Sequence, residues 1–109
     1  MLLGPDGNLW FTEAEADAIG RITPMGVITE FPLAATGHRP FDIVAGPDGN
    51  LWFSNAGSNS LGRINPGGEI SDYPIPRAGA SPLGITVGSE NALWFSDSQG
   101  VFIGRRTVA

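Results

Sequence analysis

The sequence predicts an all-β fold: a β-propeller fragment of about two and a half four-stranded antiparallel blades with a 42-residue repeat. The octapeptide Gly-Pro-Asp-Gly-Asn-Leu-Trp-Phe stands at residues 4–11 and again, unchanged, at 46–53. A degraded copy follows at 88–95, again 42 residues later. Short β-branched and aromatic runs between Gly and Pro recur without a sustained helical period, which favours strands throughout.

The repeat divides the chain into residues 4–45, residues 46–87 and a truncated third unit, residues 88–109. The first two units agree at roughly 19 of 42 positions, a self-similarity typical of repeat architectures. Each unit is predicted to supply four strands. First strands are expected at 41–45 and 83–87, second strands at 9–12, 51–54 and 93–96, third strands at 19–22, 61–64 and 103–106, and fourth strands at 28–31 and 70–73.

The turns and the strand interiors agree with this division. Pro-Asp-Gly between first and second strands suits a tight turn closed by a left-handed Gly, and the Pro-x-Gly at 24–26 and 66–68 suits the turn between third and fourth strands. The fully apolar Leu-Trp-Phe triplets indicate strands covered on both faces. Their three Trp residues are expected in the core.

Two side-chain arrangements are predicted for the third strands. Glycine is costly inside a strand unless another group needs the space, so Gly20, Gly62 and Gly104 are expected to let the neighbouring Trp ring lie across the backbone. The spacing also predicts two cross-strand ion pairs, Arg21 with Glu30 and Arg63 with Asp72, each worth at most about 1 kcal/mol.

Composition excludes several classes of protein. The formal charge is −5 and all six basic residues are Arg, without the clustered positive charge that nucleic acid requires. The sequence shows no apolar run long enough for a membrane span and no signal peptide. It contains no cysteine, which excludes disulfides and thiolate metal sites and favours a cytoplasmic location.

An open arc of blades leaves an apolar face at each end. Such faces are larger than a soluble monomer usually exposes, so we expect either further blades in a longer chain or self-association. The first of these is the favoured expectation, because Met1 falls within a strand and the third unit stops before its fourth strand. The isolated chain is then expected to be aggregated or oligomeric.

Four motifs together resemble the virginiamycin B lyase, or streptogramin lyase, family. They are Gly-Pro-Asp-Gly-Asn-Leu-Trp-Phe-Thr-Glu at 4–13, Ile-Gly-Arg-Ile-Thr-Pro at 19–24, Ile-Thr-Glu-Phe-Pro-Leu at 28–33 and Pro-x-x-Ile at 40–43. The resemblance implies a seven-bladed propeller that linearises a cyclic depsipeptide antibiotic by Mg²⁺-dependent elimination at its ester. Members of this family end on the third strand of the last blade, so this chain is expected to be a C-terminal portion.

The same resemblance places catalytic histidines directly after the Pro of the Pro-x-x-Ile motif. Phe41 and Leu83 stand there in this sequence, and neither side chain can accept a proton. The family's catalytic Glu would fall at or beside Ser98, with Asp97 adjacent. No catalytic residue is therefore assigned, and the chain is expected to be inactive alone.

Loops that lead into first strands and loops that join second to third strands share one rim of a propeller's central channel, where ligand sites converge. The side chains expected to contact a ligand on this rim are Glu13, His38, Arg39, Asp42 and Asp97. His38 is the one histidine; an exposed loop residue beside Arg39 is the favoured interpretation, and a displaced base or ligand-contacting group is the alternative. Glu15 and Asp17 extend the acidic loop of Glu13, where solvated charge is expected in preference to a metal site.

Two other functions are compatible with the sequence. One is a non-catalytic ligand- or protein-binding propeller module on the same scaffold, taking a peptide or glycan. The other is a metal-dependent lactone hydrolase of related shape, which requires carboxylates and Asn side chains that converge in the channel.

Overall fold

The computed structural model describes residues 1–33, 37–75, 81–97 and 103–107, and this part of the chain is all-β. Three antiparallel sheets form in chain order. The first sheet contains β1 (Leu2–Leu3), β2 (Leu9–Glu13), β3 (Ala18–Ile22) and β4 (Ile28–Pro32). The second contains β5 (Pro40–Ala45), β6 (Leu51–Asn55), β7 (Ser60–Ile64) and β8 (Ile70–Pro74), and the third contains β9 (Pro82–Val87), β10 (Ala92–Asp97) and β11 (Ile103–Thr107).

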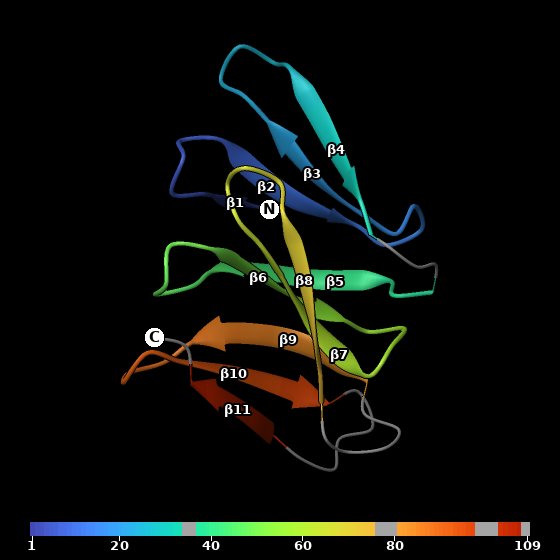
Figure 1. Cartoon of the computed structure of the whole chain (residues 1–109), viewed down its shortest axis with the longest axis vertical. Coiled ribbons are helices and arrows are strands. Elements are labelled where there is room, and N and C mark those ends of the chain that lie inside the picture. The colour runs from blue at the N-terminus through green and yellow to red at the C-terminus, as the bar shows by residue number, and fades with distance from the viewer. Residues whose placement is uncertain (34–36, 76–80, 98–102, 108–109) are drawn as a thin grey trace.

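The predicted strands match these to within one or two residues, and the all-β blade architecture is confirmed. The sheets follow one another along the long axis of the molecule, from the blue first sheet through the green and yellow second sheet to the orange third sheet (Figure 1). Within each sheet, strands that are consecutive in the sequence lie next to each other. Among the described residues, no helix has the length and hydropathy that crossing a membrane requires.

The second sheet is covered on both faces, as its Leu-Trp-Phe triplet predicts. Leu51 and Phe53 pack against Trp10 and Ile19 of the first sheet. Between them in sequence, Trp52 points to the opposite face, where it packs against the third sheet. Because all five residues of β6 are buried, this strand forms the centre of the described structure.

The structure corrects the prediction about the third-strand glycines. A Cβ at Gly62 would lie 2.2 Å from the Phe53 ring, and Gly20 and Gly104 meet Phe11 and Phe95 in the same way. The residue across each glycine is therefore Phe, because the strand register pairs Phe53 with Gly62 and Trp52 with Arg63. The Trp rings instead lie against the glycine that begins each repeat, as Trp52 does at Gly46.

The predicted cross-strand ion pairs are wrong. Arg21 lies opposite Thr29 and Arg63 lies opposite Ser71, so each arginine and its expected acidic partner point to opposite faces of the sheet. Arg63 stacks instead over the Trp52 and Tyr73 rings, 5.7 and 5.3 Å from their centroids.

Arg21 makes the equivalent stack over Trp10 and Phe31 and also donates a hydrogen bond to the carbonyl oxygen of Pro66 in the next sheet. On the Trp side of the first and second sheets, an arginine therefore covers two aromatic rings. In the third sheet, Arg105 covers the Trp94 ring.

The two outermost faces of the arc expose apolar side chains whose equivalents in the interior repeats are buried. Leu9 and Ile28 on the first sheet are 39% and 60% exposed, whereas the equivalent Leu51 is fully buried against the first sheet. On the far side of the third sheet, Trp94 and Ile103 are 40% and 71% exposed. Each outer face thus has the composition of an interior sheet-to-sheet interface.

Candidate functional site

The loop that leads into β5 is fixed by an acidic side chain from the preceding sheet. The Asp17 carboxylate accepts hydrogen bonds from the backbone N–H groups of Arg39, at 2.8 Å, and Gly37, at 3.0 Å. These bonds lower the pKa of Asp17 below its ordinary value. The acidic loop after β2 therefore positions residues 37–39 through a carboxylate.

His38 and Arg39, both predicted rim residues, lie on this loop. Their carbonyl oxygens accept hydrogen bonds from Gly57 and Ala56 in the loop between β6 and β7. His38 Nδ1 is 2.8 Å from Ser58 Oγ, which holds the half-buried imidazole at the junction of the two loops. Arg39 is exposed and has a positive φ of 47°. The two kinds of loop that the sequence analysis assigned to one rim do meet here.

Asp42 has a clear bonding role near the start of β5. One carboxylate oxygen accepts from the N–H of Ile43, and the other accepts at 3.1 Å from the N–H of Ile85 in the third sheet. Asp42 therefore joins two adjacent blades through their innermost strands. Its neighbour Phe41 is 58% exposed, and the Phe41 carbonyl oxygen accepts from Thr12 Oγ1 of the first sheet.

The other two predicted residues, Glu13 and Asp97, occupy one repeat position, the last residue of a second strand. Asp97 is buried, and its carboxylate accepts at 2.8 Å from the N–H of Ser81. Burial of the Glu13 carboxyl, together with the adjacent Glu30, raises the pKa of Glu13. The structure does not gather the five predicted residues into one cluster.

Asn55 holds the same repeat position in the second sheet and is not among the site residues predicted from the sequence. It is 1% exposed and donates to Ser60 and Asp72 from its side-chain nitrogen. The repeat period could have revealed this position, because Asn55 lies 42 residues after Glu13 and 42 residues before Asp97. The position was missed because Asn55 is uncharged, whereas Glu13 and Asp97 are acidic.

The fit of the described residues to a Mg²⁺ ion can be tested from their donor groups. Hard cations in proteins are held by several converging oxygen ligands. Across residues 1–33, 37–75, 81–97 and 103–107, no group of three or more His, Cys, Asp or Glu side chains is placed to hold a metal. Both oxygens of the Asp42 carboxylate already accept backbone hydrogen bonds. This part of the chain does not form the Mg²⁺ site that the resemblance implies.

Comparison with known proteins decides the family. A model described as "Virginiamycin B lyase family" matches residues 1–109. The chain belongs to the virginiamycin B lyase family. Its fold superposes with a TM-score of 0.90 on a catalytically inactive histidine-to-alanine variant of virginiamycin B lyase from Staphylococcus aureus, solved with quinupristin. The two sequences are 45% identical over 94% of this chain and 35% of the S. aureus chain.

Two further relatives agree. A streptogramin B lyase structure has a TM-score of 0.84 and 38% identity, over 98% of this chain and 39% of that one. Virginiamycin B lyase from Bordetella parapertussis is 51% identical over 39 residues, which are 36% of this chain and 13% of the relative. This member of the virginiamycin B lyase family therefore spans little more than a third of the length of the two solved relatives.

Ser98, the position expected to match the family's catalytic Glu, lies outside the described residues. Phe41 and Leu83 lie within them, each directly after a buried proline at the start of an innermost strand. Their carbonyl oxygens accept hydrogen bonds from Thr12 and Ser54 of the preceding blade. The backbone at both positions thus contributes to the contact between adjacent blades.

Proposed function

We propose that this chain is a blade-forming part of a streptogramin B lyase. The observation that carries the proposal is the family match over residues 1–109, together with the TM-score of 0.90 to a lyase solved with quinupristin. In the proposed reaction a base removes a proton from the carbon next to a carbonyl. The C–H electrons form an alkene, the ester C–O bond breaks, and the carboxylate leaves. The ring opens without addition of water.

The chain's own contribution to this chemistry is a wall of the channel rather than the base. Phe41 and Leu83 replace the histidines of the Pro-x-x-Ile motif, and hydrocarbon side chains cannot remove a proton. His38, Arg39 and the exposed Phe41 ring are the groups we propose to contact a bound antibiotic at the rim. The base, and the ligands of the Mg²⁺ ion that would polarise the ester oxygen, would come from further blades.

A non-catalytic binding module is the second candidate function. The specific observation in its favour is Asp42, whose carboxylate is committed to the N–H groups of Ile43 and Ile85 and joins two blades. An acidic group used in this way stabilises the channel wall and does not act as a base. In this case the same rim binds a peptide-like ligand and releases it unchanged.

We further propose that additional blades of the same type cover the two outer apolar faces, either within a longer polypeptide or in a second copy of this chain. The support is the equivalence between exposed Leu9 and Ile28 on the first sheet and buried Leu51 in the interior. Such blades would reproduce the packing of the two interior interfaces of this chain.

The experiment mixes purified chain with quinupristin and Mg²⁺ and measures binding by calorimetry and ring opening by chromatography with mass spectrometry. Elimination leaves the mass unchanged and shifts the retention time, whereas hydrolysis adds one water. We expect binding without ring opening. Ring opening by elimination would contradict the argument that Phe41 and Leu83 leave this chain without a base. Failure to bind would contradict the proposed ligand for both candidate functions.

A further inference from the structure

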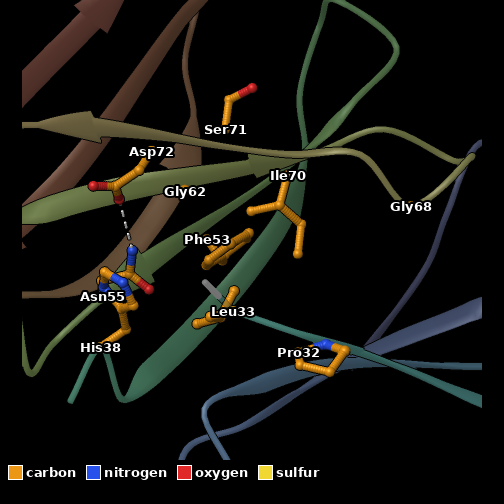
Figure 2. Close-up of a pocket in the computed structure, with 10 residues that line it drawn as sticks. All are labelled: Pro32, Leu33, His38, Phe53, Asn55, Gly62, Gly68, Ile70, Ser71 and Asp72. Carbon is orange, nitrogen blue, oxygen red and sulfur yellow. Dashed lines mark hydrogen bonds between the residues drawn. The ribbon is translucent and has the colours of Figure 1, made fainter. Parts of the chain in front are cut away.

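A cavity of about 290 Å³ lies between the first and second sheets (Figure 2). Its apolar wall is formed by Leu33, Phe53 and Ile70, and its polar wall includes Asn55 and Asp72. One water molecule occupies roughly 30 Å³ of liquid, and small-molecule sites begin at about 300 Å³. At about 290 Å³, the cavity lies at the lower end of this range and suits a molecule of only a few heavy atoms. It lies between two complete sheets, so its walls do not depend on further blades.

The orientation of the Asn55 amide is fixed by its neighbours. The side-chain nitrogen donates to Asp72 Oδ1 at 3.3 Å and to Ser60 Oγ at 3.0 Å. Because a carboxylate only accepts, the amide nitrogen must face Asp72, and the amide oxygen must face away from it. Figure 2 shows this oxygen turned toward Leu33 and Phe53, into the cavity.

That oxygen is a buried acceptor without a donor. Asn55 is 1% exposed, and its Oδ1 has no hydrogen-bond partner among the described residues. Buried polar atoms are nearly always hydrogen-bonded, because an unmatched acceptor loses its solvation without compensation. His38, which also lines the cavity, does not supply the donor through its Nδ1, since this atom contacts Ser58 Oγ at 2.8 Å. The site therefore lacks a donor that a ligand can provide.

We propose that this cavity binds a small primary ammonium ion with a short apolar chain. An ammonium group carries three donors and no acceptor, which matches the unpaired amide oxygen of Asn55. The Asp72 carboxylate, exposed at the mouth, supplies the opposite charge. Leu33, Phe53 and Ile70 bury the apolar chain. This binding requires neither a lyase base nor Mg²⁺, so it stands apart from the proposed reaction.

The test uses the full 109-residue chain and n-butylammonium chloride as the probe. Saturation-transfer NMR on the methyl protons of the probe reports binding even when the protein is oligomeric. 1-Butanol and sodium butyrate have the same alkyl chain with a neutral and an anionic head, respectively. We expect saturation transfer to butylammonium, displaced by n-propylammonium, and much weaker transfer to the other two. Equal transfer to all three would indicate non-specific apolar binding and overturn the proposal, as would no transfer at all.

Two variants locate the site. Asn55→Leu removes the acceptor at similar volume and should abolish binding. This change also leaves Asp72 without its amide donor, so a second variant, Asp72→Asn, is needed. Asp72→Asn removes the negative charge but keeps a side-chain oxygen that can accept from Asn55. It should weaken binding about fivefold. Glu15→Gln, which removes the same charge from an exposed loop, is the matched control and should bind as the original chain does. Unchanged binding in Asp72→Asn would overturn the assignment.

Discussion

At the scale of single residues, Glu13 shows how one repeat position takes different chemistry in successive blades. In the second sheet this position pairs an amide with a carboxylate, Asn55 with Asp72, joined by a hydrogen bond of 3.3 Å. In the first sheet the equivalent pair is two carboxyls, Glu13 and Glu30. Two carboxylates cannot donate to one another, and burial of the Glu13 carboxyl next to Glu30 raises the pKa of Glu13.

We predict that Glu13→Gln stabilises the chain at neutral pH. Desolvation of the Glu13 carboxyl, with Glu30 beside it, raises the pKa of Glu13 in the folded state. The stability that this group contributes is therefore fully present below the unfolded-state pKa and is lost as the pH rises through the folded-state value. The amide of Gln can donate to Glu30 at any pH, so the variant should gain about 1 kcal/mol at pH 7.

Denaturant unfolding of both proteins at pH 4 and pH 7 measures this effect. The difference in the free energy of unfolding should be small at pH 4 and should favour Glu13→Gln at pH 7. Glu15→Gln, on an exposed loop, controls for the loss of one negative charge from a chain of net charge −5. An equal gain in both variants would show that general charge repulsion, and not the pairing with Glu30, is responsible.

Residue-level chemistry was the part of the site least accessible from the sequence. Asp42 was correctly expected near the start of an innermost strand, yet its bond to the N–H of Ile85 depends on how two blades approach. His38 was identified as a rim residue, but its partner Ser58 lies on a loop 20 residues away. Contacts between blades depend on the twist and spacing of the sheets, which a repeat pattern does not encode.

At the scale of strands, most of the fold followed from the sequence. A 42-residue period, apolar triplets and Pro-Gly turns are local signals, so strand positions were predicted within one or two residues. The expected role of the third-strand glycine was also correct in kind, since a ring does lie across it. The ring is Phe and not Trp because strand register, a property of the paired strands, decides which side chain crosses.

Gly62→Ala tests that register. A methyl group there would lie 2.2 Å from the Phe53 ring, which is fully buried between two sheets and cannot move aside. We expect the variant to lose about 1–3 kcal/mol of stability, as overpacked cores do. Gly67→Ala is the matched control, because its nearest contact is 3.3 Å away on the side chain of Asn65. Similar unfolding midpoints for the two variants would argue against the Phe53 contact.

At the scale of the whole molecule, the arc has complementary ends. The far face of the third sheet carries Trp94 and Ile103 around a hollow of about 500 Å³. In the interior, the equivalent Trp52 and Leu61 face Ile85, Leu93 and Phe95 of the next sheet. The other end of the arc exposes Leu9 and Ile28, the kind of surface that covers a Trp face inside the molecule.

We therefore predict that the isolated chain associates head to tail. A contact between two different faces does not close on itself in a pair, so the chain should form rings or longer arrays, with a mean mass that rises with concentration. Ile103→Glu places a charge on a side chain that is 71% exposed here and would be buried in the contact, and it should shift the chain toward monomer. Light scattering across a concentration series measures the mass. Met25→Glu adds the same charge on an exposed turn outside both faces and should leave association unchanged. A monomer at all concentrations would mean that these faces remain stable in water, in contradiction to the packing that every interior interface of the chain displays.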